Sequence, residues 1–164
     1  MSIDIFLDRD GTLIEDTGYI SKIEDIKMMN GVIDGLKLFM ENGYRLHLVS
    51  NQSGIVRGKC TPREFAEVQS ELVRRLALEG IHFTSVNFCF HAPEDRCECR
   101  KPEIGMFEMV SKKFKVFHRS AAMIGDSEVD EKAASNFKIA FWRVGVGYMD
   151  FLIAAREVIK SIEK

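Results

Sequence analysis

Short apolar segments that alternate with longer helical patterns constrain the fold of this 164-residue chain more than any other feature. The predicted strands cover residues 3–7, 46–49, 86–90, 121–124 and 139–142. The predicted helices cover residues 32–40, 61–78, 102–114, 129–136 and 150–162. Strands that are apolar throughout and are separated by helices are typical of a parallel sheet covered on both faces. We therefore expect a doubly wound, Rossmann-like α/β fold with a five-stranded parallel sheet.

The length of the chain and the lack of any linker-like segment predict a single domain over residues 1–164. Two stretches, residues 12–31 and 91–100, fit no regular element. Neither is long enough to form a large cap domain. We expect the first to form a small flap and the second a small lid, which would leave any site between them open.

The charge balance argues against a bulk nucleic-acid partner. The chain has 23 basic and 25 acidic residues, a net charge of −2, whereas nucleic-acid binders are usually basic. No apolar stretch approaches the length of a membrane span, and the N-terminus has no basic region of the kind that opens a signal peptide. We expect a cytoplasmic protein without membrane or nucleic-acid partners, acting on a small molecule as a monomer or weak homo-oligomer.

Acidic residues follow two of the predicted strands. Asp8 and Asp10 come directly after the first strand, and Asp126 comes after the fourth. In open α/β sheets, ligands bind beyond the carboxyl ends of the strands. Carboxylates two residues apart project to the same side and repel each other, a penalty that a divalent cation removes. An oxygen-rich site of this kind suits Mg²⁺, and the turn at Gly11 and Thr12 can present backbone amides to a phosphate. The alternative is a plain surface turn, which the apolar strand before Asp8 argues against.

A second constellation consists of three thiols and one imidazole: Cys89, His91, Cys97 and Cys99. Cys-x-His followed by Cys-x-Cys supplies a tetrahedral Zn²⁺ set with no position left for water, which predicts a structural zinc loop over about residues 89–100. Such an ion would order a loop that is too polar to fold alone. The alternative is a surface loop with free thiols, and Cys60, which stands apart, is interpreted in that way.

Four short motifs carry a resemblance to a known family. Residues 6–13 read Phe-Leu-Asp-Arg-Asp-Gly-Thr-Leu, residues 50–52 read Ser-Asn-Gln, Lys101 follows the zinc loop, and residues 125–130 read Gly-Asp-Ser-Glu-Val-Asp. In this order and at these places in the fold, they resemble motifs I to IV of the haloacid dehalogenase superfamily phosphatases. The resemblance spans most of the chain.

The resemblance implies a role for each motif residue. Asp8 would attack phosphorus and become an aspartyl phosphate, and Asp10 would protonate the leaving oxygen and then deprotonate water. Ser50 would hold a phosphoryl oxygen, and Lys101 would neutralise negative charge. Mg²⁺ would be held by Asp8, Asp126 and the backbone carbonyl of Asp10.

The role of Asp130 stays open between orienting Lys101, orienting metal-bound waters and capping the following helix.

A zinc loop directly before Arg-Lys-Pro resembles the branch that contains D-glycero-D-manno-heptose 1,7-bisphosphate 7-phosphatases and histidinol-phosphate phosphatases. The loop over residues 50–59 is similar to that of the heptose enzymes, which favours removal of a heptose 7-phosphate. Ser127 departs from the lysine usual in those enzymes, and the short zinc loop is nearer the histidinol-phosphate type. The expected substrate-binding residues are Asn51, Gln52, Arg57, Lys59 and Arg100.

Three alternatives to the heptose enzyme remain open. The first is a histidinol-phosphate phosphatase or another small metabolite phosphatase of the same branch. The second is a phosphatase of nucleic-acid ends, because such enzymes share motif I. The third, from a different class, is a non-catalytic zinc-stabilised binding module.

Overall fold

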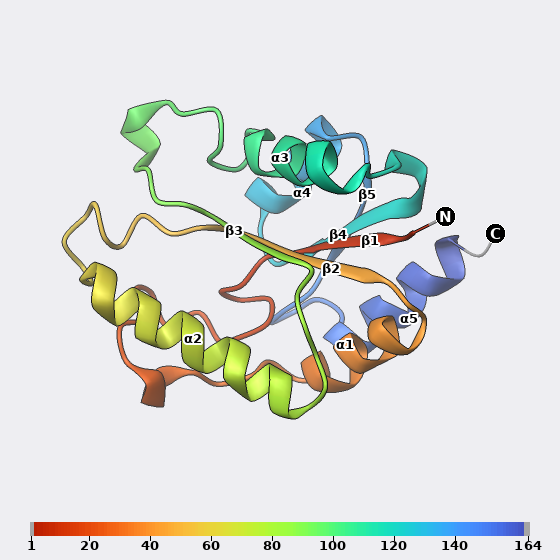
Figure 1. Cartoon of the computed structure of the whole chain (residues 1–164), viewed down its shortest axis with the longest axis horizontal. Helices are drawn as coiled ribbons and strands as arrows, with labels where there is room; N and C mark the ends of the chain where they lie inside the picture. The colour runs from red at the N-terminus through yellow and green to blue at the C-terminus, as the bar shows by residue number, and fades with distance from the viewer. Residues whose placement is uncertain (1, 163–164) are drawn as a thin grey trace.

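The computed structural model describes residues 2–162 and contains a five-stranded sheet in which every strand pair is parallel. The strands are β1 (Asp4–Leu7), β2 (Arg45–Asn51), β3 (Ser85–Cys89), β4 (Ala121–Gly125) and β5 (Ala140–Arg143). Their order across the sheet is β3-β2-β1-β4-β5, as Figure 1 shows. The predicted doubly wound α/β fold is therefore confirmed.

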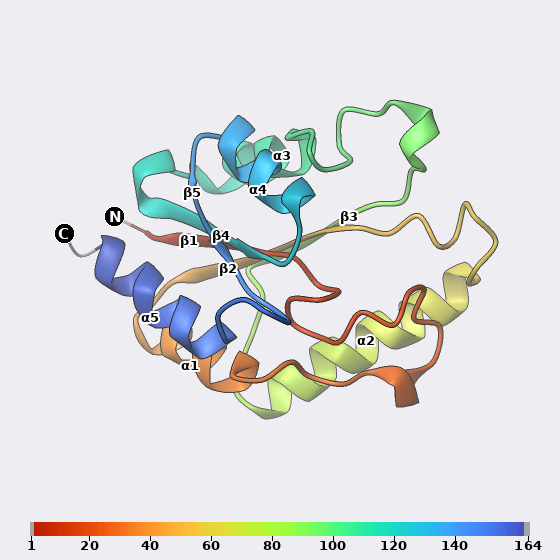
Figure 2. The same cartoon turned by 180° about the vertical axis from the view of Figure 1, so that it is seen from behind.

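Helices cover both faces of this sheet (Figures 1 and 2). The helices are α1 (Val32–Glu41), α2 (Pro62–Leu78), α3 (Gly105–Phe114), α4 (Glu128–Asn136) and α5 (Phe151–Ile162). Helices α1, α2 and α5 lie on one face, where they pack with Ile5 and Leu7, and α3 and α4 lie on the other, where they pack with Phe6. This alternation along β1 follows from the two-residue period of a strand, and it buries both sides of the central strand. No helix in residues 2–162 is long and apolar enough to cross a membrane.

The direction of winding reverses between β1 and β4. Strands β2 and β3 extend the sheet to one side of β1, whereas β4 and β5 extend it to the other. The register places Leu7, the last residue of β1, opposite Leu48 of β2 and Ile124 of β4. The backbone N–H of Asp8 continues this pairing by donating to the carbonyl of Ile124 at 3.2 Å. The crevice that such a reversal creates is the usual ligand site of this fold, so β1 and β4 deliver their terminal residues there.

The third helix begins later than predicted. We expected a helix from residue 102, but α3 begins at Gly105. The residues before it make hydrogen bonds to other segments: the N–H of Lys101 donates to the side chain of Asn51 at 2.9 Å, and the N–H of Gly105 donates to the carbonyl of Glu98 at 2.9 Å. These bonds hold residues 101–104 in a non-helical turn, so the helix does not begin at Pro102 as its sequence signal predicts.

The two irregular stretches contain little regular structure, as expected. Residues 12–31 include the 3-10 helix η1 (Ile23–Asp25) and isolated bridges that join Ile14 to Asp10 and Met28. Residues 91–100 include η2 (Pro93–Asp95), and a third 3-10 helix, η3 (His118–Ser120), precedes β4. Within residues 2–162 there is no separate cap domain.

Candidate active site

Lys101 lies at the centre of the crevice beyond β1 and β4. Its Nζ donates to Asp8 Oδ1 at 2.7 Å and to Asp130 Oδ1 at 2.6 Å, and its side chain is only 2% exposed. Asp130 belongs to the first turn of α4, where its other oxygen accepts a 2.6 Å hydrogen bond from the hydroxyl of the N-cap residue Ser127. Asp130 therefore both caps its helix and pairs with the lysine, two of the alternatives that the sequence left open.

Three carboxylates, those of Asp8, Asp126 and Asp130, form what we call the aspartate cluster. One oxygen of each lies within 4.8 Å of the others. Two glycines make this approach possible. A Cβ at Gly11, whose φ is +79°, would overlap the carboxylate of Asp126, and a Cβ at Gly125 would lie 2.6 Å from the Cβ of Asp130. The glycines of motifs I and IV are thus required by close packing of the acids themselves.

The aspartate cluster carries more negative charge than its protein partners neutralise. Burial, reinforced by the charges of Asp130 and Asp10, raises the pKa of Asp8 to about 7 even though Lys101 acts in the opposite direction. Burial and the charge of Asp130 likewise raise the pKa of Asp126 to about 6. Burial also acts to raise the pKa of Asp130, but the charge and hydrogen bond of Lys101 outweigh it and lower that pKa. Lys101 neutralises about one carboxylate, so the aspartate cluster keeps negative charge that a cation would offset.

The carboxylate of Asp10 lies apart from this cluster. It accepts hydrogen bonds from the guanidinium of Arg9, with Nε to Oδ2 at 3.0 Å and Nη2 to Oδ1 at 3.1 Å. The side-chain amide of Gln52 donates to Asp10 Oδ2 and, at 3.0 Å, to the hydroxyl of Ser50. Because these partners hold its side chain, the carboxylate of Asp10 is not part of the aspartate cluster.

Of the other expected substrate-binding residues, Asn51, Arg57 and Arg100 have protein partners. Asn51 uses both ends of its amide on the backbone of Lys101, accepting from its N–H at 2.9 Å and donating to its carbonyl at 3.0 Å. Arg57 Nη2 lies 3.5 Å from Glu94 Oε1, which connects the loop after β2 to the zinc loop, and Lys59 is exposed. Arg100 donates to the carbonyl of His91 at 3.0 Å.

The four predicted zinc ligands converge. Their ligand atoms all lie within 4.8 Å of one another, and the closest approaches are 3.2 Å between the sulfurs of Cys99 and Cys89 and 3.3 Å between Cys99 Sγ and His91 Nδ1. A tetrahedral ion with sulfur ligands at ~2.3 Å separates those sulfurs by roughly 3.8 Å. The four cysteines of the chain are free thiols, and burial raises the pKa of Cys89 to about 12. The cluster has the composition and nearly the dimensions of a tetrahedral site. A bound cation would offset the cost of ionising the buried thiol of Cys89.

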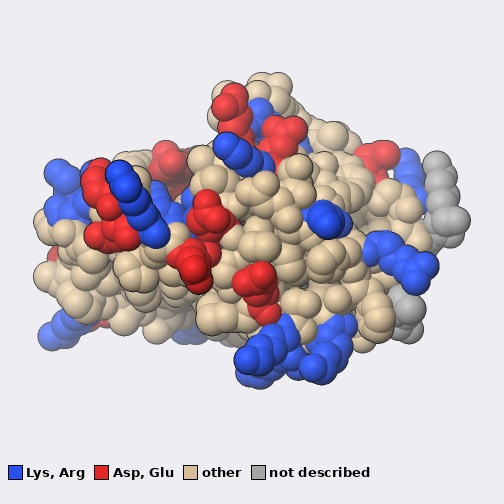
Figure 3. Space-filling view, turned by 90° about the horizontal axis from the view of Figure 1, so that it is seen from above, with Lys and Arg blue, Asp and Glu red and all other residues tan. Residues whose placement is uncertain are grey.

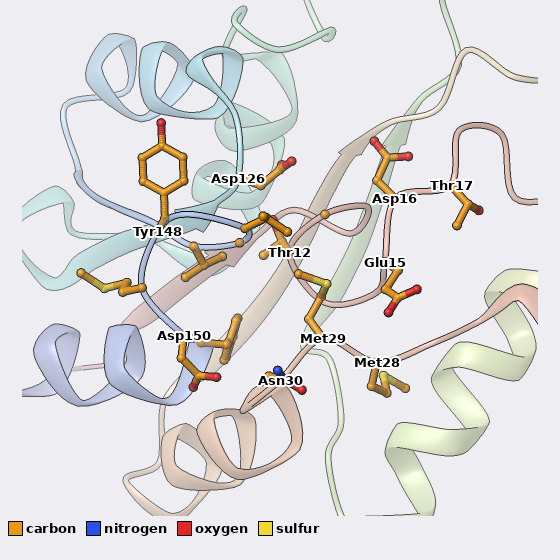
Figure 4. A pocket seen from close by; sticks show the side chains of 16 residues that line it. Thr12, Glu15, Asp16, Thr17, Met28, Met29, Asn30, Asp126, Tyr148 and Asp150 are labelled. Carbon is orange, nitrogen blue, oxygen red and sulfur yellow. The ribbon is translucent and has the colours of Figure 1, made fainter.

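A pocket of about 720 Å³ opens beside the aspartate cluster (Figure 4). Asp126 and Thr12 lie on its inner side, Glu15 and Asp16 come from the segment after motif I, and Tyr148 comes from the β5–α5 loop (Figure 4). Its lining contains no lysine or arginine. The pocket therefore suits hydroxyl groups better than a second phosphate.

Sequence reasoning missed two features of this site. Arg9 is buried and binds Asp10, although a charged residue between two aspartates is equally compatible with a solvent-exposed turn. Asn51 holds the backbone of Lys101, 50 positions away. The signal that could have found Arg9 is its position directly after an apolar strand, where a charged side chain needs a partner if it is covered.

Known proteins resemble this chain over most of its length. Residues 3–133 match the family described as polynucleotide kinase 3 phosphatase. The D-glycero-beta-D-manno-heptose-1,7-bisphosphate 7-phosphatase of Helicobacter pylori is 39% identical over 136 residues, 82% of this chain and 79% of the relative. The corresponding enzyme of Haemophilus influenzae is 38% identical over 141 residues, 82% of this chain and 77% of the relative.

A solved structure resembles the whole fold. The D,D-heptose 1,7-bisphosphate phosphatase of B. bronchiseptica, complexed with magnesium and phosphate, superposes with a TM-score of 0.88 at 25% identity and covers 98% of this chain and 99% of its own. The family match over residues 3–133 includes all four motifs, and the solved structure covers nearly the whole fold. The chain therefore belongs to the haloacid dehalogenase superfamily of phosphatases, in the family of the heptose 1,7-bisphosphate 7-phosphatases.

Proposed function

We propose that this phosphatase removes the 7-phosphate of D-glycero-D-manno-heptose 1,7-bisphosphate through an aspartyl phosphate on Asp8, with Mg²⁺ as cofactor. The observation that carries the proposal is the convergence of Asp8, Lys101 and Asp126 at the point where the sheet reverses its winding. The substrate named for the curated relatives supports the choice of sugar.

The chemistry follows from the positions of the side chains. A carboxylate oxygen of Asp8 attacks phosphorus, and the bond from phosphorus to the sugar oxygen breaks. Asp10 gives a proton to that oxygen and later takes one from the water that hydrolyses the aspartyl phosphate. Ser50, which is 1% exposed, and Lys101 hold the phosphoryl oxygens and neutralise their charge.

Mg²⁺ fits the donor set of the aspartate cluster. Carboxylate oxygens are its preferred protein ligands, and the raised pKa values of Asp8 and Asp126 indicate negative charge that the protein leaves uncompensated. We assign Asp8, Asp126 and the carbonyl of Asp10 as its ligands. When bound, it supplies positive charge to the carboxylates and to the phosphoryl group.

Zn²⁺ fits the cluster formed by Cys89, His91, Cys97 and Cys99. We propose a structural role, because the loop leads directly into Lys101. Metal analysis of the purified protein tests this assignment: one zinc per chain is expected, and a Cys99→Ser variant should retain much less. Zinc content unaffected by that substitution would contradict it.

The two sides of the site suit different parts of a sugar bisphosphate. The acidic pocket beside Asp126 offers hydroxyl and carboxylate groups to a sugar. Arg57, Lys59 and Arg100 lie on the loops on the opposite side of β1 and supply positive charge for the second phosphate. This division favours a sugar bisphosphate over a monophosphate with an uncharged end.

A second candidate function is removal of a phosphate from a nucleic-acid end, because the matching family is described as polynucleotide kinase 3 phosphatase. The charge distribution argues against it. On the face in Figure 3, small groups of basic and acidic side chains are scattered among uncharged ones and form no continuous basic surface. Backbone phosphates of a polynucleotide need such a surface.

The deciding experiment measures phosphate release with Mg²⁺ from both anomers of the heptose bisphosphate, from histidinol phosphate and from an oligonucleotide with a 3′-phosphate. The Asp8→Asn variant serves as the blank. A heptose bisphosphate preferred by about a hundredfold in kcat/KM, roughly 3 kcal/mol of transition-state binding, is the expected result. A preference for histidinol phosphate or for the oligonucleotide would overturn the assignment of the substrate. Activity that survives Asp8→Asn would show that Asp8 is not the nucleophile.

A further inference from the structure

Arg9 is the largest fully buried side chain of the described residues, and its exposed fraction is 1%. Arginine is almost never covered to this extent unless it is paired. It stands between Asp8 and Asp10, so its partners determine what it does to the reacting groups. None of the roles assigned above uses it.

The guanidinium binds Asp10 with two parallel hydrogen bonds. Nε donates to Oδ2 at 3.0 Å and Nη2 donates to Oδ1 at 3.1 Å, so both carboxylate oxygens are held. Arginine forms such a pair through its planar fork, which a lysine cannot reproduce. The plane of the Asp10 carboxylate is therefore set by Arg9.

The remaining contacts of Arg9 tie it to helix α2 and to the end of β2. Nη2 also donates to Gln52 Oε1 at 2.9 Å, Nη1 donates to Gln69 Oε1 at 3.4 Å, and the guanidinium lies 5.5 Å from the ring centroid of Phe65. Phe65 and Gln69 are one helical turn apart and share a face of α2. The amide of Gln69 is turned so that its oxygen faces Arg9, while its buried Nε2 has no partner among the described residues.

These contacts connect Arg9 to the segments that flank one loop. Gln52 precedes the loop over residues 53–61, and α2 follows it. The loop carries Arg57 and Lys59, which are assigned above to the second phosphate. The buried side chain of Arg9 thus joins the carboxylate of Asp10 to the two segments that flank the loop over residues 53–61.

We propose that Arg9 is a positioning residue that orients Asp10 as the general acid and base. The inference rests on the proposed function. Arg9 transfers no proton itself, since a guanidinium remains charged in proteins. Asp10 donates its proton to the sugar oxygen as the bond to phosphorus breaks, and this transfer requires the carboxyl group to be within hydrogen-bonding reach.

The test compares two leaving groups in the Arg9→Met variant. The sugar alkoxide of the heptose bisphosphate needs a proton, whereas the acetate released from acetyl phosphate does not. The parameter measured is kcat/KM, which reports steps only up to release of the leaving group. We expect a loss of about a hundredfold or more on the sugar phosphate, the usual range for general acid catalysis, and a loss below about tenfold on acetyl phosphate.

A double-mutant cycle separates positioning from general damage. Combining Arg9→Met with Asp10→Asn should cost no more on the sugar phosphate than Asp10→Asn alone, because Arg9 then has no acid to orient. Arg9→Lys should recover part of the activity. Equal losses of kcat/KM on the two leaving groups would overturn the proposal. So would a double variant whose loss is the product of the losses in the two single variants.

Arg45 provides a matched control. It binds Asp4 with the same two-bond geometry, at 2.7 Å and 2.8 Å, but at the opposite end of β1. Arg45→Met should lower the unfolding temperature and leave the ratio of the two kcat/KM values unchanged. If Arg9→Met does not fold, Arg9→Lys, which keeps the charge but cannot form the two parallel bonds to Asp10, gives the same comparison with a smaller expected loss.

The test also distinguishes two kinds of failure. It needs acetyl phosphate and any one alkyl phosphomonoester that the wild-type protein hydrolyses. A wrong substrate assignment would be seen as no turnover of the heptose bisphosphate by the wild type. A wrong role for Arg9 would be seen as equal losses on both leaving groups.

Discussion

A buried aspartate lies at each end of strand β1, with Asp4 as its first residue and Asp8 directly after its last, and the charges of the two are compensated to different extents. Asp4, at the start, is fully buried and binds His47 Nε2 at 2.9 Å and Arg45 Nε at 2.7 Å. His47 Nδ1 lies 2.8 Å from the hydroxyl of Ser85, so its second nitrogen also has a partner. Burial acts to raise the pKa of Asp4, but the bonds and charges of His47 and Arg45 outweigh it and lower that pKa.

Asp8, at the other end of the strand, shares its lysine with Asp130 and has a pKa raised to about 7. At the start of β1, protein partners alone compensate the charge of Asp4. At its carboxyl end, the aspartate cluster keeps negative charge that a cation would compensate. Removing one partner of a compensated buried charge is costly, whereas a charge left uncompensated is available for binding and chemistry.

The largest expected effect comes from Asp8→Asn. Removing the nucleophile should lower kcat by at least about 10⁴-fold, as loss of a covalent nucleophile does elsewhere. The same change should stabilise the metal-free protein at pH 8, because it removes a carboxylate whose ionisation burial disfavours. Steady-state phosphate release and thermal unfolding check the two parts. A destabilised Asp8→Asn protein would break the contrast between the two strand ends.

Lys101→Met tests the compensating charge at the carboxyl end. It leaves Asp8 and Asp130 without their shared cation, so kcat should fall by about 10²- to 10³-fold, the usual loss for a group that stabilises transition-state charge. The metal-free variant should unfold at a lower temperature, and Mg²⁺ should restore stability more than activity. Unchanged kcat would show that the lysine only stabilises the fold.

Asp4→Asn tests the opposite end. It leaves Arg45 and His47 without their charged partner, which should cost about 3 kcal/mol of unfolding free energy in a urea titration. Asp4 and Asp8 are separated by roughly 13 Å along the strand, so kcat should stay within about twofold. A fall in kcat comparable to that of Lys101→Met would mean that the two ends are coupled.

The smallest expected effect is a dependence of Mg²⁺ stabilisation on pH. A raised folded-state pKa means that the contribution of Asp8 to stability is present below about 3.8 and is lost as the pH rises through about 7. Asp126, with a pKa of about 6, acts in the same direction. The increase in unfolding temperature on adding Mg²⁺ should therefore grow between pH 5 and pH 8. In Asp8→Asn this growth should be smaller, and a pH-independent increase would contradict the assignment of the cation to this cluster.

The lowered pKa of Asp4 predicts the reverse dependence. Its contribution to stability is present above its ordinary pKa of 3.8 and is lost as the pH falls through its folded-state value. Acid unfolding of Asp4→Asn should therefore be less steep at low pH than that of the wild type, with or without Mg²⁺.

The sequence by itself determined the fold class, the strand ends that carry the site and the two candidate metal sets. Apolar runs of strand length and local motifs are sufficient for this, because periodicity and spacing act over a few residues. Cys89, His91, Cys97 and Cys99 lie within eleven positions, so their convergence needed only a short loop.

Only the tertiary structure decided which buried charges are compensated. Asp4 and Asp8 lie at the two ends of the same apolar run, but the partners that compensate their charges lie far along the chain: His47 is 43 positions from Asp4, and Lys101 is 93 positions from Asp8. The parallel register of β1 with β2 and β4 and the turn before α3 bring these groups together. The pairing of Arg9 with Asp10 was equally hidden, because burial of a charge depends on what packs over it, and α2 supplies that cover from more than fifty positions away.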